Sequence, residues 1–224
     1  MWRVTIKGIL AHKIRFLLTG VAVILGVSFI AGTLVLTATI SKTFDGLFAN
    51  IYANTDAVVR AEANFEGAFN AGRGRIDASL LPEVRRTSGV AQADGAVQGF
   101  AQVIDKKGEA LNASGQGAPA LGFSYIADPD LSSFHLATGR APRTRNQIVI
   151  DQNTADKTKY TLGAAVPVIT KEGRADYTLV GTAKFGSENS LLGATAVIFT
   201  PPTASRVLGE PGKFDQILVT SDAG

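Results

Sequence analysis

The chain of 224 residues is 46% apolar and 18% charged, a composition that excludes an intrinsically disordered protein. It has no cysteine, which excludes a disulfide scaffold, a thiol nucleophile and a cysteine-based zinc site. Four basic residues lie within the first 15 residues, whereas residues 16–224 carry 18 basic and 19 acidic residues. A nucleic-acid partner is therefore not expected, because it requires a basic face on the folded part.

Residues 1–15 combine the basic side chains Arg3, Lys7, Lys13 and Arg15 with apolar side chains at helical spacing. The apolar positions are Trp2, Ile6, Ile9 and Leu10, which follow the i, i+4, i+7, i+8 pattern. This pattern predicts a basic helix that lies in the membrane interface and contacts anionic lipids. The alternative is an irregular tail whose charges serve only as a topology signal.

Residues 16–40 contain no charged side chain, and 14 of these 25 residues are Leu, Ile, Val or Phe. A helix of this length spans about 37 Å, which is enough to cross a hydrocarbon core of about 30 Å. A cleaved signal peptide is the alternative, but its apolar region is shorter. We expect the helix to lie in the plasma membrane. The positive-inside rule then predicts that the N-terminus is cytoplasmic and that residues 41–224 are extracytoplasmic.

Two small-xxx-small pairs lie within this predicted membrane helix. Ala22 precedes Gly26 by four residues, and Ser28 precedes Gly32 by four. Small residues at this spacing allow helix backbones to approach closely in lipid. We expect these positions to pack against another membrane helix.

An amphipathic stalk is predicted for residues 41–52, directly after the membrane span. Its apolar positions follow the i, i+3, i+4, i+7, i+8 pattern and are Phe44, Leu47, Phe48, Ile51 and Tyr52. The stripe is expected to pack against the outer domain or against a partner helix.

Residues 53–224 form an α+β domain in this interpretation, because short β-branched and aromatic runs alternate irregularly with few helices. Strands are predicted at residues 57–61, 96–104, 120–126, 147–151, 165–170, 177–185, 195–200 and 216–220. Helices are predicted at residues 77–88, 152–160 and 201–209, and loops at 64–75 and 112–119.

The sequence carries no recognisable catalytic, cofactor-binding or metal-binding motif, so we do not expect an enzyme. No Walker A loop and no G-x-S-x-G motif is present. His135 is expected to be a packed or surface histidine. Asp128 and Asp130 flank Pro129 and are expected to form a turn rather than a metal site.

Several stretches, in this order and spacing, resemble an ABC transporter permease of the MacB/FtsX-like family. They are residues 79–84 (SLLPEV) with 88–91 (SGVA), 136–142 (LATGRAP) with 147–151 (QIVID), 162–163 (LG) and 177–181 (YTLVG). These stretches are similar to segments of that family's periplasmic core domain, and the resemblance covers nearly the whole chain.

The resemblance implies a mechanical function. A separate cytoplasmic ATPase would bind ATP, so this chain itself would need no cofactor. The membrane helix and stalk would transmit motion to an outer domain that handles a lipid, lipoprotein, peptide or drug. Further permease helices or a second permease copy would be the membrane partners.

One departure from the family is expected to matter. Family members continue into at least three more membrane helices, whereas this sequence ends after one predicted span. We therefore expect the chain to be a truncated product or a fragment of a longer permease. The alternative function is a single-pass anchored protein whose outer domain binds an extracytoplasmic ligand without an ATPase.

Overall fold

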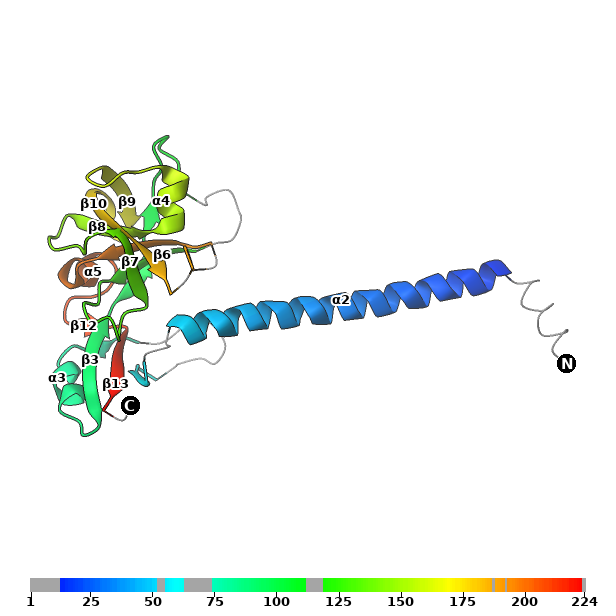
Figure 1. The fold of residues 1–224 in the computed structure, drawn as a ribbon, viewed down its shortest axis with the longest axis horizontal. Coiled ribbons are helices and arrows are strands. Elements are labelled where there is room, and N and C mark those ends of the chain that lie inside the picture. The colour runs from blue at the N-terminus through cyan, green and yellow to red at the C-terminus, as the bar shows by residue number, and fades with distance from the viewer. Residues whose placement is uncertain are drawn as a thin grey trace. The chain divides into compact units, whose positions relative to one another are not determined.

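A computed structural model describes residues 13–51, 55–62, 74–111, 119–186, 188–191 and 193–222. The chain divides into two compact units, the first ending at Phe48 and the second beginning at Ala49. Each unit is described by itself below. Figure 1 gives the element labels used here.

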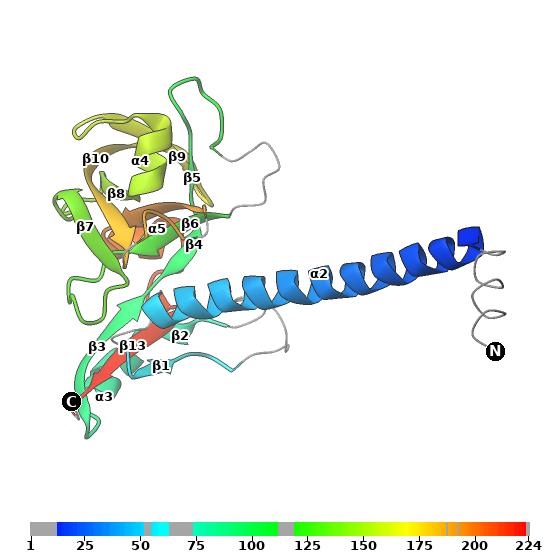
Figure 2. The same cartoon turned by 45° about the vertical axis from the view of Figure 1, so that its right-hand side comes forward.

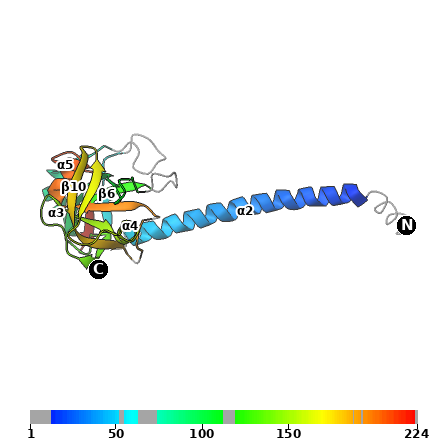
Figure 3. The same cartoon turned by 90° about the horizontal axis from the view of Figure 1, so that it is seen from above.

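The first unit contains one long helix, α2 (Lys13–Ile51), of 39 residues. Figure 3 shows α2 as an uninterrupted helix. The predicted membrane segment 16–40 lies entirely within it, and helical backbone continues through the predicted stalk as far as Ile51. The expected interfacial helix falls largely on residues 1–12, which lie outside the described residues. Lys13 and Arg15 already belong to α2, so no break separates them from the apolar segment.

The second unit is rich in strands, as the α+β prediction requires. Its strands are β1 (Ala57–Val59), β2 (Ile76–Asp77), β3 (Val90–Ala96), β4 (Gln98–Phe100), β5 (Gln102–Val103), β6 (Ala120–Ser124), β7 (Phe134–Gly139), β8 (Gln147–Asp151), β9 (Ala165–Thr170), β10 (Gly173–Phe185), β11 (Thr195–Phe199), β12 (Lys213–Phe214) and β13 (Gln216–Ser221). Its helices are α3 (Leu80–Arg85), α4 (Gln152–Thr158) and α5 (Pro201–Val207).

A small lobe is built from both ends of this unit, residues 55–62, 74–96 and 213–222. The antiparallel sheet β1-β13-β3 forms its centre, and β2 pairs with β12 beside it. Helix α3 is fixed to this sheet because Arg85 Nε donates a hydrogen bond to the carbonyl of Ala93 at 2.8 Å. Ile76, Ala93, Ile217 and Val219 form one buried apolar cluster of this lobe, and Leu218 belongs to a second cluster with Ile126 and Leu131.

A large lobe, residues 97–212, is inserted between β3 and β12 and carries an eight-stranded sheet. The strand order is β4-β6-β11-β8-β10-β9-β5, with β7 paired to β10. The end strands β4 and β5 are separated in sequence only by Ala101, so the sheet closes back on itself. The central strands β8 and β11 are buried along almost their whole length, as expected for strands with apolar cover on both faces.

The two faces of this sheet have separate apolar clusters. Alternate residues of β8, including Ile148 and Ile150, join Phe199 and Leu179 in the main core, to which α5 contributes Ala204. Val149, between these two isoleucines, belongs to the cluster on the opposite face. That second cluster is extended by edge-on contacts among the rings of Phe123, Phe134 and Phe185.

The structure confirms most of the predicted strands, but some strand bounds differ and some strands were not predicted. Strands β8 and β9 have the predicted bounds, whereas β10 begins four residues earlier than predicted. The strand predicted at 96–104 is two short strands interrupted at Ala101. Strands β3 and β7 were not predicted, because β3 contains Ala, Asp and Gly and β7 is exposed, so neither shows buried alternation.

The helices of this unit lie where they were predicted but are shorter. Helix α3 begins at Leu80 with Ser79 as its N-cap, so it starts three residues after the predicted start at Asp77. Asp77 instead accepts a hydrogen bond from the Ser79 backbone N–H at 2.8 Å, which forms a turn before the helix. Most of the loop predicted at 64–75 and all but the last residue of the loop predicted at 112–119 lie outside the described residues.

Candidate functional site

The surface of α2 between Leu17 and Ala38 is the first candidate functional feature, because this part of the helix carries no charged side chain. Between Leu17 and Ala38 the helix is long and apolar enough to cross a membrane. Thirteen large apolar side chains of α2, from Ile14 to Leu36, are 45–76% exposed. In the described part of the second unit, the exposed large apolar side chains are Leu80, Phe100, Leu136 and Leu162, at 36–54%. A continuous apolar surface of this extent is stable in lipid and not in water.

Two polar side chains in this helix are already satisfied internally. Thr19 Oγ1 donates to the carbonyl of Arg15, and Thr33 Oγ1 donates to the carbonyl of Phe29, both at 2.9 Å. Each bond reaches back one helical turn, which removes the need for water as a partner. The local geometry is therefore compatible with a hydrocarbon environment.

The structure places all four predicted helix-packing residues on exposed positions of α2. These residues are Ala22, Gly26, Ser28 and Gly32. Apart from the chain neighbours and the backbone of α2 itself, no described atom lies within 4 Å of the position that a Cβ would take at Gly26 or Gly32. Because successive residues are rotated by about 100°, the pair Ala22 and Gly26 faces a different direction from the pair Ser28 and Gly32. Their packing role stays a prediction.

The predicted stalk and basic residues are only partly within the described residues. Phe44, Leu47, Phe48 and Ile51 lie on the helical backbone of α2. Tyr52, Arg3 and Lys7 lie outside the described residues. Lys13 and Arg15 lie in the first turn of α2, directly before its apolar segment.

The residues that the sequence offered for chemistry have local structural roles in the second unit. Ser124 Oγ is buried and accepts the backbone N–H of Val97 at 2.9 Å. Asp128 accepts the backbone N–H of Asp130 at 2.9 Å, which forms the expected turn. His135 is exposed on β7. Within the described ranges, no group of three or more His, Asp or Glu side chains is arranged to hold a metal ion.

Asp151 is a fully buried carboxylate that joins three elements of the large lobe. It ends β8 and is the N-cap of α4, where its Oδ2 accepts the backbone N–H of Thr154 at 2.9 Å. Its Oδ1 accepts the backbone N–H of Ala196, in β11, at 2.7 Å. Burial raises the pKa of Asp151, although the hydrogen bonds from Thr154 and Ala196 oppose the shift.

A second polar cluster joins the small lobe to the large lobe. Arg75 Nε donates to Asp215 Oδ1 at 3.0 Å, and Arg75 Nη1 donates to Glu210 Oε1 at 3.2 Å. Asp215 Oδ2 also accepts the backbone N–H of Gln98, at the start of β4, at 2.8 Å. A hydrogen bond from Lys213 and its charge, together with Arg75, lower the pKa of Glu210. This junction therefore lies where the chain passes from the small lobe to the large lobe, before β4, and where it returns, before β12.

The sequence interpretation did not identify Asp151 or the junction as structurally important. An Asp at the end of an apolar strand, directly before a helix, is a typical N-cap signal that could have found Asp151. No comparable signal exists for Arg75 and Asp215, because they are 140 residues apart in the chain.

The fold and the apolar helix together point to one family of membrane proteins. The family model described as MacB-like periplasmic core domain matches residues 16–224, which include the apolar helix as well as the strand-rich unit. The chain belongs to this family. The predicted resemblance to MacB/FtsX-like permeases is thereby confirmed.

Two solved structures have the fold of this MacB-like chain. The periplasmic region of MacB from Actinobacillus actinomycetemcomitans matches with a TM-score of 0.53 and 15% identity, covering 78% of each chain. The extracellular domain of the noncanonic ABC-type transporter YknZ from Gram-positive bacteria matches with a TM-score of 0.52 and 11% identity, covering 75% of this chain and 85% of that one. No curated protein sequence matches the chain.

Family membership fixes the general place of the chain in the cell. The apolar helix anchors it in a membrane, and the MacB-like domain is extracytoplasmic. The α+β prediction for an outer domain on one N-terminal membrane helix is confirmed.

Proposed function

We propose that this chain acts as the N-terminal part of a permease subunit in an ATP-driven ABC transporter. The observation that carries the proposal is the family match across residues 16–224, because one family model covers both the membrane helix and the MacB-like domain. A cytoplasmic ATPase subunit binds and hydrolyses ATP, and this chain passes the resulting motion outward. The extracytoplasmic domain handles a lipid, lipoprotein, peptide or drug.

The continuity of α2 supports a mechanical role. Its 39 residues make a rod of about 58 Å, roughly twice the hydrocarbon thickness, so helical backbone extends well beyond the bilayer. The rod needs an anchor on each side. Arg3, Lys7, Lys13 and Arg15 supply one at the anionic cytoplasmic leaflet, which sets the N-terminus inside.

The proposal requires neighbours in the membrane. The small residues of α2 pack against further permease helices or a second permease copy, which increases the stiffness of the transmitting helix. The stalk stripe, Phe44 to Tyr52, then acts as the lever between membrane and outer domain.

The test is co-purification of the native complex. The native gene product is tagged, extracted in mild detergent with Mg-ATP and vanadate, and its partners are identified by mass spectrometry. We expect an ABC ATPase subunit in fixed ratio, with ATP hydrolysis in the purified complex. A tagged single-span protein from the same membranes serves as the control.

The result that contradicts the proposal is a stable, purified protein without any ATPase subunit or ATP hydrolysis. That outcome favours the alternative, a single-pass anchored module that binds an extracytoplasmic ligand. The two functions are therefore distinguished by one preparation.

A further inference from the structure

Strand β7 has one margin with which no described strand pairs, although the N–H and C=O of its first residue, Phe134, are hydrogen-bonded to Ser132 Oγ. Among the described strands β7 pairs only with β10, through residues from Gly139 to Phe134. Every residue of β7 after Phe134 is exposed, and Figure 2 shows the strand at the margin of the large lobe. A strand margin of this kind offers backbone N–H and C=O groups to a further strand.

The backbone of β7 is held firmly at both ends. At one end the Phe134 ring packs edge-on against the rings of Phe185 and Phe123, with centroid distances of 4.7 and 5.0 Å. At the other end Thr138 Oγ1 and Thr182 Oγ1 are hydrogen-bonded at 2.8 Å. A strand fixed in this way loses little conformational entropy when a partner pairs with it.

The chain leaves β7 through a turn that permits only glycine. Gly139 has a φ of +74°, and a Cβ there would lie 2.3 Å from the carbonyl oxygen of Val180. The following residue continues the ladder, since the Arg140 N–H donates to the same oxygen at 2.9 Å. The loop that begins at Arg140 is therefore directly continuous with the strand margin.

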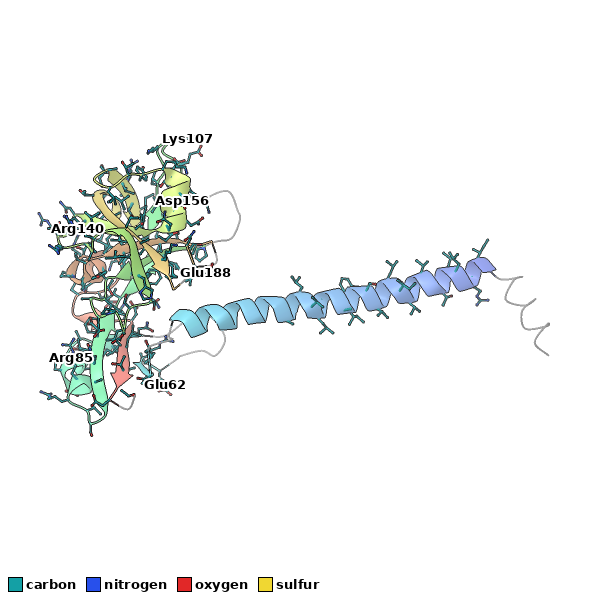
Figure 4. All side chains as sticks on the ribbon, viewed as in Figure 1. Glu62, Arg85, Lys107, Arg140, Asp156 and Glu188 are labelled. Atoms are coloured by element: carbon teal, nitrogen blue, oxygen red, sulfur yellow. The ribbon has the colours of Figure 1, made fainter. Side chains whose placement is uncertain are left out.

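This loop presents three exposed arginines, Arg140, Arg143 and Arg145. Gln147 orders it, because its Oε1 accepts from Arg140 Nη1 at 3.1 Å and from the Arg143 backbone N–H at 3.0 Å. Figure 4 shows Arg140 on the outside of the large lobe. The loop is thus an ordered, basic extension of β7.

The three loop arginines form no ion pair with another described residue. The ion pairs among the described residues involve Arg75, Arg85, Arg206 and Lys213, and none involves the three loop arginines. Residues 131–150 contain no Asp or Glu. Guanidinium groups bind carboxylates in a two-pronged geometry, so this loop favours an acidic partner.

We propose that β7 and the loop 140–145 bind an extended, acidic segment of another polypeptide. The segment adds a strand to the free margin of β7, and its carboxylates bind Arg140, Arg143 and Arg145. Main-chain pairing supplies the affinity, whereas the arginines fix the register and exclude neutral or basic segments. The inference goes beyond the proposed transport function and needs neither ATP nor an ATPase.

A polypeptide accounts for both halves of the surface. An anionic lipid headgroup would engage the arginines alone and would leave the adjacent strand margin unused. Because the loop continues the strand without a break, one extended chain can reach both features.

The test uses the full chain in neutral nanodiscs and fluorescein-labelled synthetic peptides in an anisotropy assay. The probe peptide has an alternating valine–threonine half and a half with three glutamates, made in both chain orders. Control peptides replace glutamate by glutamine, or carry N-methyl groups on one or the other set of alternate backbone amides in the valine–threonine half. Protein variants are Arg143→Glu with Arg145→Glu, and Arg174→Glu as a matched control on the part of β10 that pairs with β9.

We expect the glutamate peptide to bind in one chain order only. Charge reversal by Arg143→Glu with Arg145→Glu is expected to weaken peptide binding about tenfold or more. The control Arg174→Glu is expected to leave the affinity within about twofold. N-methylation of the set that faces β7 abolishes binding, and methylation of the other set does not. Binding of both N-methylated control peptides would overturn the proposal, and so would the absence of any binding. A third result would also overturn the proposal: no peptide binds, but the nanodisc-embedded protein floats with phosphatidylglycerol vesicles and the double variant does not.

Discussion

The carboxylate of Asp151 connects β8, α4 and β11 through two backbone hydrogen bonds. Asp151→Ala would leave the N–H groups of Thr154 and Ala196 buried without an acceptor. We expect a loss of about 2–4 kcal/mol in the free energy of unfolding. Lys157→Ala, at an exposed site on the same helix, is the control and should change stability little. Thermal unfolding of the full chain in detergent, followed by circular dichroism, measures both.

The pH dependence of stability tests the protonation of the same residue. Because burial raises the pKa of Asp151 above its unfolded value of about 3.9, the folded state holds this proton more tightly. The stability that Asp151 contributes is therefore complete below that value and declines as the pH rises through the folded pKa. Asp151→Asn should remove this decline, so the difference between wild type and variant should shrink from acid to neutral pH. A difference that grows with pH would contradict the assignment.

At the scale of elements, the strength of the sequence signal followed the local environment of each segment. Helix α2 and the buried strands β8 and β9 were predictable, because continuous apolar runs show directly in the sequence. Strand β7 was not, because its residues are exposed and it is a strand only through its pairing with β10.

The small residues of α2 permit a prediction at this scale. Gly26 and Gly32 point in different directions, so each can be tested alone. If either pair packs against a partner helix, Gly26→Leu or Gly32→Leu should weaken association with the other transporter subunits while insertion is unchanged. Gly20→Leu, on a third face of α2, is the matched control. Co-purification yields measure association, and carbonate extraction measures insertion. Unchanged association in both variants would show that neither glycine packs against a partner.

At the scale of the whole molecule, contacts between distant parts of the sequence could not be predicted. The junction of Arg75, Glu210 and Asp215 joins the two lobes, between which the chain passes twice. Its residues come from opposite ends of the domain. The α+β class followed from composition and strand spacing, whereas the insertion of the large lobe into the small lobe is visible only in the pairing of β13 with β1 and β3.

The central proposal is that α2 crosses the membrane once, with the MacB-like domain outside and the basic N-terminus inside. The chain has no cysteine, so single-cysteine variants report one position each. Lys107 is exposed in the outer domain, and Lys7 lies before α2. With a membrane-impermeant maleimide on intact cells whose outer face is accessible, Lys107→Cys should be labelled at once. Lys7→Cys should be labelled only after the membrane is permeabilised. Labelling of Lys7→Cys in intact cells, or protection of Lys107→Cys, would contradict the account.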